Sequence, residues 1–263
     1  MHSWYQAMMG TNESLYAWMD EGFTSWASDE VMNHLRKEGL VGGEVEDNPH
    51  AGTYQTLRGF RGTGQQEALS THADHFATNA AYGIAAYVNG SVFLEQLRYI
   101  VGEEAFACTL QRYYYDWRFK HPNPNDFIRV AEKCSRLELD WYKEYWVNST
   151  NYPDYAVKDV VAADGARASI QLEKVGRMPM PLEIKVTKKD GSEHWYYTAP
   201  QIMRGEKEKP AYATDWTVLN DWPWTHPTFE FGVEYPLADI QRVELNPRGR
   251  MYEDDVDNNR WGE

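Results

Sequence analysis

The chain has 263 residues, of which 42% are hydrophobic and 14% aromatic, so it can bury a core and lacks the composition of a disordered protein. Its 40 acidic and 26 basic residues give a formal net charge of −14, which argues against binding to nucleic-acid backbones. No apolar run approaches the roughly 18 residues that a membrane-spanning helix needs, and the opening Met-His-Ser-Trp lacks the pattern of a signal peptide.

The first part of the chain, residues 1 to about 152, is predicted to be helical. Strong helix formers fill Glu13–Lys37, with Asn12 as the expected N-cap and Gly39 as the expected end. The Gly-rich, polar sequence between residues 41 and 71 predicts loops rather than a further helix.

Helical periodicity returns at residue 79. Apolar residues recur at helical spacing over Asn79–Val101, and Gly102 is the expected C-cap. Further helices are predicted over Glu103–Phe119, from Asn125 or Asp126 to about Cys134, and over Leu137–Val147. The two cysteines of the chain, Cys108 and Cys134, are too few for a disulfide scaffold, and we expect two reduced thiols on helices.

The sequence period changes after Pro153 from about 3.6 to 2, which indicates β-strands. Two alternating runs joined by the turn Lys189–Ser192 are typical of a β-hairpin. The predicted strands are Ala168–Leu172, Leu182–Thr187, His194–Thr198, Trp216–Leu219, Thr228–Val233 and Ile240–Leu245. They favour a small antiparallel β-sandwich over residues 153–263. The acidic run Glu253–Asn259 lacks the spacing of a calcium loop, and we expect a solvated terminus.

The chemistry-bearing residues lie in the first hundred positions. His2, within His-Ser-Trp-Tyr-Gln, is followed after 18 intervening residues by Glu21, within Asp-Glu-Gly-Phe-Thr-Ser. These short sequences and their spacing resemble those of the zinc aminopeptidases of the aminopeptidase N family, a branch of the gluzincins. That family carries HExxH, in which two His one helical turn apart bind zinc, and a third ligand, a Glu, 18 residues further on. The resemblance implies that His2 and Glu21 are metal ligands.

The first half of this motif has no counterpart in the sequence. Its first His and its Glu would precede residue 1, and Met1 would occupy the last variable position. We therefore expect the C-terminal portion of a longer enzyme, inactive without the N-terminal half of the same protein.

A second resemblance involves tyrosines. The family carries a Tyr-x-Lys-Gly motif, often with another Tyr five residues earlier. The segment Tyr87-Val88-Asn89-Gly90 matches this motif, with Asn89 in place of Lys. The earlier tyrosine is Tyr82. The match implies that the Tyr87 hydroxyl stabilises the oxyanion formed during peptide hydrolysis.

The resemblance spans residues 2–153, and the remainder is similar to the β-domain of bacterial members. It implies an α+β protein: the helical C-terminal part of a thermolysin-like catalytic domain over residues 1–152, then the β-sandwich. The implied function is zinc-dependent removal of N-terminal residues from peptide substrates. The family segment that binds the substrate amine has no counterpart here, so endopeptidase or epoxide-hydrolase activity stays open, as do the compartment and the oligomeric state.

Three further residues bear on the site. Asp20, next to Glu21, is expected to be a helix-surface acid, the alternative being a side chain that orients a ligand. His72 and His75, three residues apart, are expected to line a polar loop rather than to bind metal.

Two functions of another class compete with catalysis. One is a non-catalytic peptide-binding module derived from the same fold, which the sequence upstream of His2 would distinguish from an enzyme. The other is carbohydrate binding by the Trp-rich second part, which binding to insoluble polysaccharide would reveal.

Overall fold

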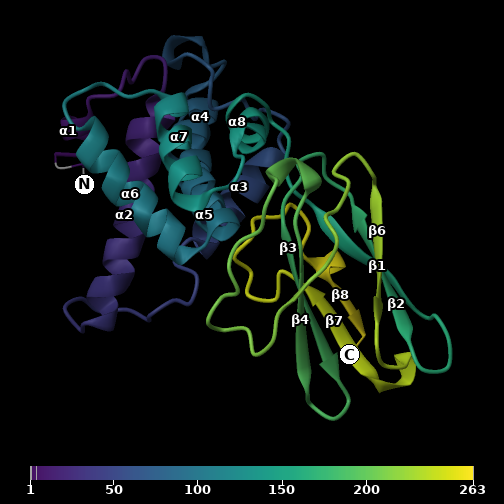
Figure 1. The fold of residues 1–263 in the computed structure, drawn as a ribbon. Helices are drawn as coiled ribbons and strands as arrows, with labels where there is room; N and C mark the ends of the chain where they lie inside the picture. The colour runs from purple at the N-terminus through teal and green to yellow at the C-terminus, as the bar shows by residue number, and fades with distance from the viewer. Residues whose placement is uncertain (1, 4, 263) are drawn as a thin grey trace. The chain divides into compact units, whose positions relative to one another are not determined.

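The computed structural model describes residues 2–3 and 5–262, so Met1 and Trp4 of the motif region lie outside the described residues. The chain is an α+β protein with two compact units, residues 1–150 and 151–263 (Figure 1). The first unit is helical and the second contains the strands. The assignment of residues 1–152 and 153–263 as a truncated catalytic domain and a sandwich domain stays a prediction.

The helical unit is built around two packed helix pairs, α2 with α5 and α6 with α7 (Figure 1). Its helices are α1 (Tyr5–Met9), α2 (Ala17–Lys37), α3 (Ala51–Arg61), α4 (Asn79–Gly83), α5 (Gly90–Val101), α6 (Glu103–Trp117), α7 (Pro124–Ser135) and α8 (Asp140–Val147). A π-helical segment, η2 (Ile84–Asn89), joins α4 to α5. Aromatic rings fill the core between these helices, with the rings of Phe23 and Phe127 centred 5.0 Å apart.

Helix starts differ from the predictions where a turn precedes the helix. The Asn12 side chain accepts the N–H groups of Ser14 and Leu15 at 3.1 and 3.2 Å, so it closes a turn, and α2 begins only at Ala17. Helix α7 begins at Pro124, earlier than predicted, because Asn123 forms a capping box with Asp126.

Helix α3 lies where loops were predicted. Gly52 and Gly59 lower its intrinsic helix propensity, which is why the composition indicated loops. The helix is held by packing instead, because Tyr54 and Leu57, one helical turn apart, are almost fully buried.

The prediction of two reduced thiols is wrong. Cys108 on α6 and Cys134 on α7 form a disulfide that closes a loop of 26 residues. The packing of α6 along α7 brings the two Cα atoms to 5.9 Å, a proximity that sequence spacing does not reveal. The bond constrains the unfolded chain and ties the two helices together.

The second unit contains a three-stranded and a five-stranded sheet. Its strands are β1 (Tyr155–Ala162), β2 (Ala168–Lys174), β3 (Leu182–Lys188), β4 (Glu193–Thr198), β5 (Thr217–Val218), β6 (Thr228–Val233), β7 (Ile240–Leu245) and β8 (Arg260–Gly262). The strand orders are β1-β2-β6 and β5-β4-β3-β7-β8. All pairs are antiparallel except β4 with β5, which is parallel. Alternate residues such as Ile170, Ile184 and Val243 fill the core.

Only the middle of the acidic run near the C-terminus, residues 255–257, is exposed to solvent as expected. Glu253 is fully buried and accepts hydrogen bonds from the backbone N–H of Tyr155 at 3.3 Å and from the Asn259 amide at 2.6 Å. Burial raises the pKa of the Glu253 carboxyl to about 8. The run is ordered because its polar groups find partners and because β8, directly after it, pairs with β7.

The backbones of α2 and α5 touch where two glycines meet. A Cβ atom at Gly90 would lie 2.9 Å from Gly22 Cα and 3.2 Å from Trp18 Cβ, and one at Gly22 would lie 2.6 Å from the Gly90 carbonyl carbon. Both positions therefore need glycine for close approach rather than for an unusual φ. The contact places Glu21 beside the π-helical segment that carries Tyr87.

We expect Gly90→Ala to lower the free energy of unfolding of the helical unit by about 1–3 kcal/mol, because the added methyl group meets backbone that cannot move aside. Gly83→Ala is the matched control: Gly83 is helical and a Cβ there would meet nothing within 4 Å. It should raise stability by about 0.5–1 kcal/mol. Denaturant unfolding followed by circular dichroism measures both, and equal effects of the two variants would contradict the contact.

Candidate metal centre

The centre is formed by the first turn of α2 and the residues just before α1. Asp20 lies in that first turn, where the helix dipole stabilises negative charge, and Glu21 follows it directly. His2 precedes α1, and its carbonyl accepts the backbone N–H of Ala7 at 2.9 Å. The turn thus presents two carboxylates to one imidazole.

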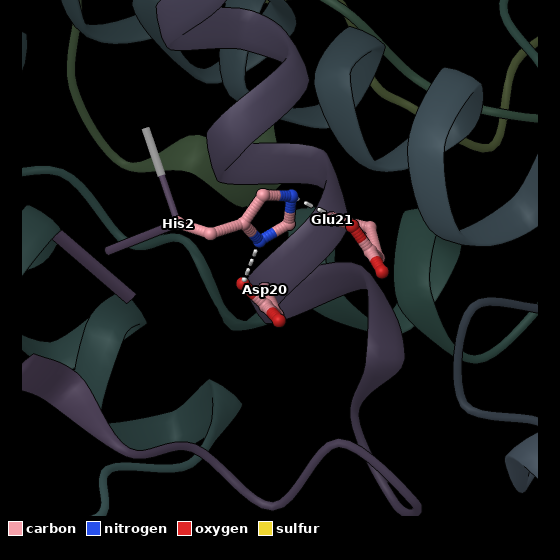
Figure 2. A group of neighbouring side chains, drawn as sticks. All are labelled: His2, Asp20 and Glu21. Atoms are coloured by element: carbon pink, nitrogen blue, oxygen red, sulfur yellow. Dashed lines mark hydrogen bonds and ion pairs between the residues drawn. The ribbon is translucent and has the colours of Figure 1, made fainter. Parts of the chain in front are cut away.

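The imidazole of His2 lies between the two carboxylates (Figure 2). His2 Nε2 is 3.3 Å from Glu21 Oε2, and His2 Nδ1 is 3.0 Å from Asp20 Oδ1. His2, Asp20 and Glu21 form a group whose ligand atoms lie close enough to hold one metal ion. The structure therefore brings together the two residues that the motif names as ligands, and adds a second carboxylate, that of Asp20.

The donor atoms fit zinc. Two ligands of a tetrahedral zinc ion, each about 2.0–2.2 Å from it, lie roughly 3.4 Å apart, close to the separation of His2 Nε2 and Glu21 Oε2. Glu21 Oε2 is buried and has no hydrogen-bond donor. A buried carboxylate oxygen without a donor is costly, and a cation would relieve that cost.

Asp20 is not the helix-surface acid that we expected. It is 8% exposed, and burial raises the pKa of its carboxyl, an effect that the hydrogen bond with His2 opposes. The prediction failed because residue spacing along α2 does not reveal that the chain preceding α1 covers the first turn. The sequence signal for this contact is the position of Asp20 next to a ligand.

Tyr87, on the π-helical segment η2, contacts the His2–Asp20–Glu21 group through Glu21. Its hydroxyl donates a hydrogen bond to Glu21 Oε1 at 2.6 Å, which raises the pKa of Tyr87 to about 12. Tyr87 is 41% exposed. Tyr82 is half-buried and packs its ring edge against Phe76, and burial followed by the charge of Glu21 raises its pKa.

The two histidines of the polar loop stay apart from this group. The ring centres of His72 and His75 are 4.9 Å apart, and His72 Nδ1 accepts the backbone N–H of Asp74 at 3.1 Å. Neither belongs to a potential metal group within residues 2–3 and 5–262. The loop is attached beside the start of α2, because Ala73 N–H donates to the Ser14 carbonyl at 2.8 Å.

A second His–carboxylate group, which the sequence did not reveal, lies further along α2. The fully buried His50 has Nε2 at 3.0 Å from Glu30 Oε1 and at 3.5 Å from Glu95 Oε2, while Nδ1 is 3.2 Å from Asp29 Oδ2. Burial alone lowers the pKa of His50, but the bonds to Asp29 and Glu30 and the charge of Glu95 outweigh it and raise the pKa to about 9.

This second group includes an arginine. Arg98 Nη1 lies 2.9 Å from Glu30 Oε1 and 3.5 Å from Glu95 Oε2, and both His50 nitrogens face carboxylates. Arg98 and His50 thus already pair with these carboxylates. The group is an ion network that fastens α2 and α5 to the start of α3.

No helix among the described residues is long and apolar enough to cross a membrane.

Comparison with known protein families classifies the helical unit. The family profile described as "Peptidase family M1 domain" matches residues 1–146 of the chain, which therefore belongs to this family.

Three relatives illustrate the family. Glutamyl aminopeptidase of Sus scrofa is 23% identical over 169 residues, which cover 61% of this chain and 17% of the relative. Alanine/arginine aminopeptidase of Saccharomyces cerevisiae is 22% identical over 159 residues, 60% of this chain and 18% of the relative. The crystal structure of Legionella pneumophila aminopeptidase A in complex with aspartic acid matches with a TM-score of 0.59 and 15% identity, covering 92% of this chain and 24% of that one. This last similarity establishes the fold alone. The chain spans about a sixth of the length of the two curated relatives.

The His50 network predicts a loss of stability at alkaline pH. Folding raises the pKa of His50 from the ordinary 6.5 to about 9. The network's contribution is therefore complete below pH 6.5 and is lost as the pH rises through about 9. The loss should amount to roughly 3 kcal/mol.

Denaturant unfolding of the helical unit between neutral and strongly alkaline pH measures this effect. His50→Gln should flatten the pH dependence, because the glutamine cannot carry the proton. His34→Gln, at an exposed position of α2, should retain the dependence of the parent. A parent and a His50→Gln variant with the same slope would contradict the network.

Proposed function

We propose that His2 and Glu21 are two of the three protein ligands of a catalytic zinc ion in an aminopeptidase that removes N-terminal residues from peptides. The observation that carries the proposal is the approach of His2 Nε2 to Glu21 Oε2 at 3.3 Å, with Glu21 Oε2 buried and without a donor. The remaining His ligand and the general-base Glu of the motif would come from the N-terminal half of the same protein.

The choice of aminopeptidase rests on the relatives. The enzymes from pig and yeast are aminopeptidases by name, and each aligns over about 60% of this chain. This activity implies peptide substrates. The formal net charge of −14 argues against a nucleic-acid partner. The exposed position of Cys108 and its disulfide to Cys134 favour an oxidising compartment.

Zinc bound at this centre would supply Lewis-acid chemistry and a water of lowered pKa. Glu21 and His2 would bind and orient the ion. Tyr87 would donate a hydrogen bond from its hydroxyl to the carbonyl oxygen of the scissile bond as negative charge develops there. The Tyr87 hydroxyl lies 2.6 Å from Glu21 Oε1, so it would be near a peptide bound beside that carboxylate.

The chain alone should bind zinc only weakly, because two protein ligands leave the ion open to water. After dialysis against a weak chelator we expect no stoichiometric zinc. With zinc in excess, competition against a coloured chelator should detect binding that His2→Ala and Glu21→Gln each remove. His72→Ala, a nearby histidine outside the group, should bind like the parent.

Two results would contradict the assignment of the ligands. One is stoichiometric zinc that survives dialysis in both His2→Ala and Glu21→Gln. The other is weak binding that neither substitution changes.

Extension of the chain by the upstream segment of an M1 relative, which carries the missing motif residues, should restore zinc-dependent release of N-terminal residues. In that enzyme Tyr87→Phe should lower kcat by about a hundredfold or more with little change in KM, because the lost hydroxyl acts mainly in the transition state. Steady-state kinetics on short peptides measures the effect.

Tyr82→Phe is the control for this experiment, since the resemblance gives Tyr82 proximity without a role. If Tyr87→Phe kept full activity while Tyr82→Phe lost it, our alignment of the Tyr-x-Lys-Gly motif would be wrong by five residues. Full activity of both would move the oxyanion role to another donor.

A further inference from the structure

We propose that the second unit binds a calcium ion where the acidic run 253–259 meets the start of β1. The ligands are two carboxylates and two amide oxygens, those of Asp154, Glu253, Asn258 and Asn259. The proposal does not depend on the candidate metal centre of the helical unit. The spacing of the acidic run alone does not reveal the site, because Asp154 lies 104 residues before Asn258.

Two buried carboxylates form the middle of this group. Glu253 is fully buried and Asp154 is 6% exposed. The Asn259 amide donates to Glu253 Oε2 at 2.6 Å, and the Asn258 amide donates to Asp154 Oδ1 at 3.0 Å. Glu253 Oε1 accepts the backbone N–H of Tyr155, the residue directly after Asp154. Two adjacent asparagines therefore hold the two carboxylates in one region.

The protein does not supply a positive charge to Asp154. Within residues 2–3 and 5–262 no Lys or Arg pairs with it, and the side chain that donates to it is the neutral amide of Asn258. Burial, together with the charges of Asp255 and Asp254, raises the pKa of the Asp154 carboxyl, which the bond from Asn258 opposes. Burial raises the pKa of Glu253 to about 8 although neutral donors oppose it. A cation between the carboxylates would offset the cost of burying them.

Two buried oxygens in the same place have no hydrogen-bond donor. They are Asn258 Oδ1 and Asn259 Oδ1, and Asn259 is 9% exposed. Each of these side chains points into the group, because its nitrogen donates to a carboxylate. Buried amide oxygens in native proteins almost always have a partner. A half-turn of each amide would exchange its nitrogen for its oxygen, so that both oxygens and both carboxylates would face a bound cation.

The chemistry of the donors selects calcium. All four side chains offer oxygen, the ligand that the hard cations Ca²⁺ and Mg²⁺ prefer. Mg²⁺ demands a nearly regular octahedron, whereas Ca²⁺ accepts about six to eight oxygens in flexible arrangements. The ligands here come from a loop and from the short 3-10 helix η5 (Asp257–Asn259), which suit the less demanding ion. Asp255 and Asp257 are exposed beside the group and would attract a cation from solution.

A purely structural role for the group makes a different prediction. If protonated Glu253 and the amides were complete as a hydrogen-bonded core, calcium would not stabilise the chain, and a further carboxylate would only destabilise it. If the group binds calcium, a carboxylate in place of the Asn258 amide should tighten binding, because calcium affinity depends on the number of charged ligands.

Isothermal titration calorimetry of the full chain with calcium chloride tests the proposal, and thermal unfolding gives a second readout. We expect one ion with a Kd of about 0.1–1 mM, and an unfolding temperature raised by about 5–10 °C at roughly 10 mM calcium. Asp154→Asn should weaken binding by about tenfold or more, and Asn258→Asp should tighten it by about tenfold. Asp239→Asn, which removes an exposed acid of the same unit, is the matched control and should bind like the parent.

Three results would overturn the calcium site. One is a parent chain that binds no calcium up to roughly 10 mM. Another is equal binding by the parent and a folded Asp154→Asn variant. The third is unchanged or weaker binding by Asn258→Asp, which decides the matter if Asp154→Asn does not fold. Zinc binding by folded Asp154→Asn should equal that of the parent, so the calcium site and the candidate metal centre can fail separately.

Discussion

The backbone contact between Gly22 and Gly90 is the constraint on which the geometry of the candidate centre depends. It brings α2 and α5 together without an intervening side chain, next to Glu21 in the sequence and three residues after Tyr87. The 2.6 Å hydrogen bond between Tyr87 and Glu21 requires this close approach. The π-helical turn that carries Tyr87 contributes as well, because an extra residue per turn changes the direction in which a side chain leaves the helix.

Two groups of one histidine and several carboxylates lie along α2, and their charge balance separates them. Both histidines have carboxylates at both ring nitrogens, but the His50 group also contains Arg98, which pairs with Glu30 and Glu95. The His2 group has no Lys or Arg partner among the described residues, and one oxygen of Glu21 has no donor. Proximity of acids and a histidine is therefore a poor guide to metal binding unless the nearby cations are counted.

The sequence predicted the elements whose signals are local. Strands β6 and β7 lie where alternation placed them, and Gly102 ends α5 as expected. Features set by tertiary contacts were missed, namely α3, the Cys108–Cys134 disulfide and the buried Glu253. The candidate site divides in the same way. A motif names His2, Glu21 and Tyr87, whereas the contacts of Asp20 and His50 depend on segments that meet only in the folded chain.

Anomalous scattering from crystals soaked in zinc tests the central claim most directly, because it locates the ion rather than inferring it from affinity. The account predicts one site about 2.0–2.2 Å from both His2 Nε2 and Glu21 Oε2. Zinc bound instead among Glu30, His50 and Glu95, or bound elsewhere with the His2 site empty at saturating zinc, would contradict it.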